Sequence, residues 1–139
     1  MKAETQIGIW IDLNEAIIAT GNEIIDVVTS EFTIGNAKGG SGSATPYGPQ
    51  DSVSESKVLE KRKNTLRTYF SEIMERIEHY QEVLILGPGI IKNKLEEILR
   101  ESHKTKHLYT RVETADKMTL NQFRAKIRDY FSQTGGSIN

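Results

Sequence analysis

The residues with the clearest chemical potential lie in one glycine-rich segment, residues 35–52, which reads GNAKGGSGSATPYGPQDS. The segment carries the dipeptide Gly39-Gly40 and only two charged side chains, Lys38 and Asp51. Few of its side chains are able to pack into a hydrophobic core. A long loop of this kind between rigid elements either carries function or is disordered. We expect a flexible loop here, and its role depends on the elements beside it.

Cations follow this segment at positions expected to be helical. The candidate RNA-binding residues are Lys38, Lys57, Lys61, Arg62, Lys63 and Arg67. The second half of the same expected helix is acidic, with Glu72, Glu75 and Glu78. This order opposes the helix dipole, which favours acidic residues early and basic residues late. One interpretation is a phosphate-binding stripe beside the loop, and the alternative is an ordinary solvated helix face.

A turn at residues 87–89, Gly-Pro-Gly, leads from an apolar run into an expected helix. Because the N-terminus of a helix presents free N–H groups, this turn is a candidate anion site. It lacks the spacing of the dinucleotide-binding and Walker motifs. The alternative interpretation is a turn without a ligand.

Asp12 stands at the end of the first expected strand, where a carboxylate is able to contribute to a two-metal nuclease site. Glu55, Glu60 and Asp116 are the further carboxylates that such a site would use. Their spacing is not diagnostic. An aspartate in a turn more commonly accepts local backbone hydrogen bonds, and this interpretation is preferred.

Composition excludes several classes of protein. The chain has 139 residues, a net charge of −1 and no cysteine, which rules out disulfides and thiolate sites. Its three histidines lack zinc-site spacing. No signal-peptide core and no apolar run of membrane-spanning length is present. We expect one cytoplasmic domain over residues 1–133 with a frayed tail over residues 134–139, and neither a metal nor another cofactor.

Hydrophobic periodicity predicts the elements. Alternating apolar residues indicate strands near residues 7–11, 16–20 and 24–34, joined by tight turns into an antiparallel meander. A capping box at residues 52–55 begins a helix that extends to about residue 80. The continuous apolar run at residues 83–86 predicts a buried central strand.

The C-terminal elements follow the same rules. Residues 91–102 have helical periodicity, residues 107–112 are of β type, and a second capping box, at Thr119 and Gln122, begins the last helix. The order β-β-β-α-β-α-β-α predicts an α/β fold with a mixed sheet of the ribonuclease-H-like kind.

The succession of segments resembles the middle domain of eukaryotic and archaeal class-one peptide chain release factors and the corresponding domain of Pelota. The resemblance rests on the position of the glycine-rich loop, on the basic helix at residues 56–63 (SKVLEKRK), and on the strand-turn-helix at residues 84–95 (LILGPGIIKNKL). It covers about residues 5–132. It implies a ribonuclease-H-like core, a cytoplasmic role in translation, and the ribosome, rRNA or tRNA as partner.

In release factors the loop bears Gly-Gly-Gln and helps water to attack the peptidyl-tRNA ester. In this chain Ser41 stands where the family has glutamine, directly after Gly39-Gly40, and the loop's only glutamine is Gln50. The resemblance therefore implies Gly39, Gly40, Ser41 and Gln50 as the candidate catalytic residues. The backbone amides of the first three would serve as hydrogen-bond donors to the oxyanion.

The leading hypothesis is a translation-factor-like domain that binds RNA and inserts its glycine-rich loop into an RNA site. A peptidyl-tRNA hydrolase acting in peptide release or ribosome rescue is one alternative. Another is a non-enzymatic protein-interaction module, homodimeric through an exposed sheet edge or through Trp10. A metal-dependent nuclease is the least favoured.

Overall fold

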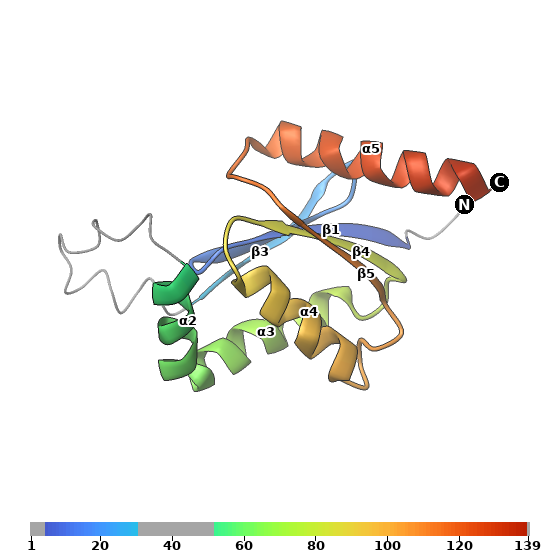
Figure 1. The fold of residues 1–139 in the computed structure, drawn as a ribbon. Coiled ribbons are helices and arrows are strands. Elements are labelled where there is room, and N and C mark those ends of the chain that lie inside the picture. Colours follow the sequence, from blue (N-terminus) through green and yellow to red (C-terminus); the bar gives the residue numbers. More distant parts are fainter. Residues whose placement is uncertain (1–4, 31–51, 139) are drawn as a thin grey trace.

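The computed structural model describes residues 5–30 and 52–138 (Figure 1). The strands are β1 (Gln6–Ile11), β2 (Glu15–Ala19), β3 (Ile24–Thr29), β4 (Glu82–Gly87) and β5 (Tyr109–Thr114). The helices are α2 (Ser52–Lys61), α3 (Lys63–Ile77), α4 (Ile91–Glu101) and α5 (Leu120–Ile138). The described residues form a mixed α/β fold, as the element pattern predicts.

The strands form one five-stranded sheet in the order β3-β2-β1-β4-β5. β1 and β2 are antiparallel, as are β2 and β3, so the predicted meander is confirmed. β4 is parallel to both of its neighbours, β1 and β5. The apolar run at residues 83–86 lies in β4 and is buried, which confirms a central strand.

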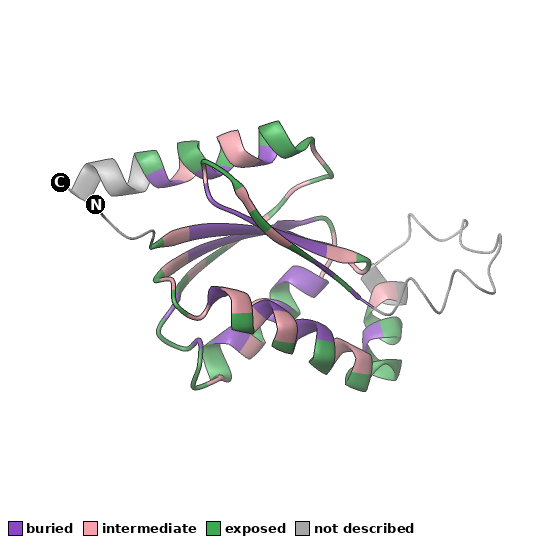
Figure 2. Cartoon of the chain, turned by 180° about the vertical axis from the view of Figure 1, so that it is seen from behind, coloured by how far each residue is buried: buried purple, intermediate pink, exposed green. Residues whose placement is uncertain are grey.

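Helices cover both faces of the sheet (Figure 1). α5 lies on one face, where Phe123 and Ile127 pack against Trp10, Leu84 and Leu86. α3 and α4 lie on the other face and pack against the remaining inward-facing side chains of β1, β2 and β4. Figure 2 shows the resulting band of buried residues along the central strands. The continuous hydrophobic character of β4 follows from this burial on both faces.

The helix predicted from residue 53 to about residue 80 is wrong as a single element. It is divided at Arg62, whose backbone has φ −112° and ψ 43°, into α2 and α3. One straight helix of that length would extend for about 40 Å, whereas a strand of this sheet spans about 20 Å. The break allows Leu59 of α2 and Phe70 of α3 to enter the same core.

Element boundaries differ slightly from those expected. β3 ends at Thr29, and residues 31–34 of the expected strand lie outside the described residues. α5 includes residues 134–138, which were assigned to a frayed tail. The capping box that begins α5 is confirmed, because the Thr119 N–H donates to Gln122 Oε1 at 2.9 Å and the Gln122 N–H to Thr119 Oγ1 at 3.1 Å.

Candidate functional site

The residues implied as catalytic, Gly39, Gly40, Ser41 and Gln50, lie outside the described residues, as does Lys38. The described part of the candidate site begins at α2. The other predicted RNA-binding residues lie on α2, on α3 and at the break between them.

We call these five residues the basic corner: Lys57, Lys61, Arg62, Lys63 and Arg67. All five side chains are exposed. The break at Arg62 separates the last residue of α2, Lys61, from the first residue of α3, Lys63. Lys57, Lys61 and Lys63, together with Glu60, line a surface hollow of about 400 Å³. The structure therefore brings three of the predicted cations, Lys57, Lys61 and Lys63, together around a shared depression.

The lysines of the basic corner have no ionic partner within the described residues. By contrast, Lys94, Arg100, Lys117 and Lys126 each form an ion pair with a glutamate. Among the described residues, the Arg67 guanidinium donates to the amide oxygen of Asn64, at 3.5 Å. Exposed cations without acidic partners produce a local positive potential even in a chain with little net charge. Such a surface favours a ligand with several negative charges.

Beside the basic corner lies a more apolar groove that the sequence analysis missed. Its volume is about 490 Å³, and Leu59, Leu66, Phe70, Met74 and Ile98 contribute its apolar wall. Lys63, Arg67 and Lys94 also line it. The apolar residues at positions 66, 70 and 74 have helical spacing, which predicts that they share one face of α3. This spacing does not reveal that α2 and α4 form the other walls of the groove.

The Glu55 carboxylate caps a helix other than its own. Its two oxygens accept the N–H groups of Ile90 and Ile91, each at 3.2 Å, at the start of α4. The capping box proposed at residues 52–55 involves side chains outside the described ones, and the described hydrogen bonds of Glu55 go to α4. The turn at residues 87–89 does precede an anion-binding helix N-terminus, but the anion is this internal carboxylate.

Two neighbours adapt to the Glu55 carboxylate. A Cβ atom on Gly89 would lie 2.1 Å from Glu55 Oε1, so a side chain there would displace the carboxylate. Lys92 is buried, and its ammonium donates to the Gly89 carbonyl oxygen. Burial lowers the pKa of Lys92, and the nearby charge of Glu55 partly opposes that shift. Glu55 thereby connects α2, the first helix after the glycine-rich segment, to the start of α4.

Asp12 acts as a turn residue. Its Oδ1 accepts the N–H groups of Asn14 at 2.8 Å and Glu15 at 2.9 Å. The buried Tyr69 hydroxyl of α3 donates to the Asp12 carbonyl oxygen at 2.9 Å. Burial raises the pKa of Tyr69, with smaller contributions from the Asp12 and Glu15 charges. In residues 5–30 and 52–138, no three His, Asp or Glu side chains converge as a metal site would require, so the nuclease hypothesis gains no support there.

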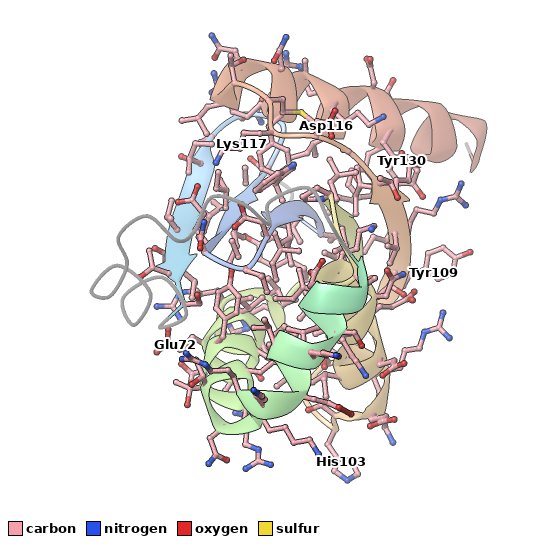
Figure 3. All side chains as sticks on the ribbon, turned by 60° about the vertical axis from the view of Figure 1, so that its left-hand side comes forward. Glu72, His103, Tyr109, Asp116, Lys117 and Tyr130 are labelled. Atoms are coloured by element: carbon pink, nitrogen blue, oxygen red, sulfur yellow. The ribbon has the colours of Figure 1, made fainter. Side chains whose placement is uncertain are left out.

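Trp10 belongs to the core beneath α5 and is only 2% exposed. Its indole N–H donates to the Asp116 carbonyl oxygen at 3.2 Å, and the Lys117 ammonium lies 4.8 Å from the ring centroid. Figure 3 shows Asp116 and Lys117 in the segment that leads from β5 to α5. The alternative that placed Trp10 in a dimer interface is therefore wrong, because α5 and this segment cover it.

No protein-family model matches the chain, and no curated protein matches it either. In the part of the chain that the structure describes, none of the helices has the length and apolar character needed to cross a membrane.

Proposed function

We propose that this protein is an RNA-binding domain of the translation-factor type, with the ribosome or tRNA as its partner. The observation that carries the proposal is the basic corner, where Lys57, Lys61 and Lys63 line a hollow together with Glu60, and where none of the three lysines forms an ion pair within the described residues. Lysine ammonium groups bind phosphate as compact, strongly hydrated charges. RNA presents phosphates in a closely spaced series, so several cations are able to act together.

The fold supports the same proposal. The meander β1-β2-β3 is followed by parallel strands with helices on both faces, which agrees with a ribonuclease-H-like core of the release-factor and Pelota type. The basic corner begins at the first described helix after residues 35–51. In the proposed complex, the cations hold an RNA backbone while the glycine-rich segment enters an adjacent RNA site.

The proposal is tested by measuring affinity for purified ribosomes and for tRNA across a salt series. A double variant, Lys61→Glu with Lys63→Glu, reverses two charges of the basic corner. We expect it to weaken binding at low salt and to reduce the slope of log K against log salt by about 1–2. This loss of slope follows because fewer counterions are released from the RNA.

A matched variant, Lys104→Glu with Lys106→Glu, changes the net charge by the same amount. Both lysines are exposed after α4, away from the basic corner. It is expected to bind as the parent does. Equal losses in the two variants would show that only net charge matters, and no binding by the parent at low salt would refute the proposal.

A further inference from the structure

The two edges of the sheet, β3 and β5, differ in whether another strand is able to pair with them. Exposed edges recruit strands unless something blocks them. On β3, the Val27 N–H donates to the Asp26 side chain at 2.8 Å, and the same carboxylate pairs with Arg76 at 2.6 Å. The register with β2 also shifts at a bulge near Ile18 and Ala19. This edge is therefore already obstructed by its own side chain and irregularity.

The β5 edge is open. The Tyr109 N–H donates to the Gln81 carbonyl and the Ala115 N–H to the Gly87 carbonyl, both at 2.9 Å. Because bonding groups alternate along a parallel strand, Thr110, Val112 and Thr114 present their N–H and C=O groups away from β4. Within the described residues, no group accepts from these three outward amides.

The side chains of β5 show a self-complementary order of charge. Arg111 and Glu113 are in register with Leu84 and Leu86, which places both charged side chains on the α5 face of the sheet. They lie 3.6 Å apart, and both remain partly exposed. Tyr109 is 73% exposed, and Figure 3 shows it on the outer side of β5.

We propose that β5 pairs with β5 of a second copy of this chain, antiparallel, with Val112 at the twofold axis. The outward groups of Thr110, Val112 and Thr114 then meet their equivalents as hydrogen-bonded pairs. Arg111 of each copy lies opposite Glu113 of the other, in the pairs whose side chains approach most closely. Tyr109 of each copy lies opposite Ala115 of the other.

Charge selects this register over its neighbours. Centring the pairing on residue 111 places Arg111 opposite its own equivalent, and centring it on residue 113 does the same for Glu113. Like charges directly opposite one another on neighbouring strands are unfavourable. Only the register centred on Val112 pairs both charges with opposite partners and also uses all three outward residues.

A charge-swap experiment tests the proposal by sedimentation equilibrium over a concentration series. Arg111→Glu alone places two glutamates opposite each other, and Glu113→Arg alone does the same with two arginines. Each is expected to raise the dimer dissociation constant about tenfold. Mixing the two variants in equal amounts restores opposite charges at both positions, so the mixture is expected to recover the affinity of the parent.

Circular dichroism and thermal unfolding of each variant establish that it folds as the parent does. A parent that stays monomeric up to its solubility limit overturns the proposal and leaves the β5 edge to an extended segment of another protein. Single variants that associate as tightly as the parent, or a mixture that does not recover, overturn it as well. Recovery in the mixture supports it, because the two variants restore opposite charges when residues 111 and 113 of different copies lie opposite each other.

Discussion

At the scale of single residues, Glu55 connects parts of the chain that are distant in sequence. Its carboxylate satisfies two N–H groups at the start of α4 that have no partner within their own helix. Gly89 leaves space for it, because a methyl group there would overlap with Glu55 Oε1. This contact holds α2, and with it the basic corner, against the turn before α4.

A double-mutant cycle tests this contact. Glu55→Ala is expected to lower the free energy of unfolding by about 1–3 kcal/mol, because two partly buried donors lose their acceptor. Gly89→Ala is expected to cost a similar amount, since its methyl group displaces the carboxylate. Combined, the two substitutions should cost little more than Glu55→Ala alone. Additive losses in urea unfolding would contradict a shared contact.

The contribution of Asp26 to the stability of the fold is expected to depend on pH. The hydrogen bond from Arg76, with a further one from the Val27 N–H, lowers the pKa of Asp26. A lowered native pKa stabilises the fold above the unfolded value of about 3.9, and this stability is lost as the pH falls through the native pKa. The pair is partly exposed, so its contribution is less than about 1 kcal/mol.

Asp26→Asn is therefore expected to be slightly less stable than the parent near neutral pH. The difference should disappear in acid, once the parent's carboxyl group is protonated. Denaturant unfolding across a pH series measures the free energy of unfolding of Asp26→Asn and of the parent at each pH. A difference that persists in acid would show that packing, rather than charge, is responsible.

At the scale of elements, α5 approaches β1 closely because Gly8 has no side chain. A Cβ atom there would lie 2.6 Å from both Cγ1 and Cδ1 of Ile127. The same helix is held at the turn between β2 and β3, where Arg124 donates to the Asn22 carbonyl at 3.0 Å and Arg128 to the Gly21 carbonyl at 2.6 Å. The position of α5 therefore depends on a small residue in a strand and on two cations in the helix.

Gly8→Ala is expected to destabilise the fold by about 1–3 kcal/mol, because it overpacks the contact between α5 and β1. Ile127→Val removes one of the two crowding atoms and should recover part of this loss in the double variant. By itself it should cost about 0.5–1.5 kcal/mol. Thermal unfolding of the three variants measures the effect, and the absence of any recovery would place the strain elsewhere.

At the scale of the whole molecule, the two proposed interaction surfaces lie on different elements. The basic corner is formed by α2 and α3, whereas the proposed dimer edge is β5. α4 lies between them, because it packs against α3 on one side and against β5 on the other (Figure 1). Charge reversal at Lys61 and Lys63 should therefore leave self-association unchanged. The RNA-binding proposal and the dimer proposal are thus tested independently, and either one is able to fail while the other holds.

The sequence by itself determined the features that local spacing encodes. The alternation at residues 7–11, the continuous apolar run at residues 83–86 and the capping box at Thr119 and Gln122 each correspond to the element that was predicted. The turn interpretation of Asp12 belongs with them, because its hydrogen-bond partners are only two and three residues away. Such features depend on groups within one turn or one strand.

Only the tertiary structure decided which distant groups meet. Glu55 binds the start of α4, Trp10 is covered by α5, and the expected long helix is divided at Arg62. It also distinguishes the obstructed edge at β3 from the open edge at β5. These outcomes depend on strand order and on packing between elements far apart in the chain, and residue spacing carries no direct signal of either.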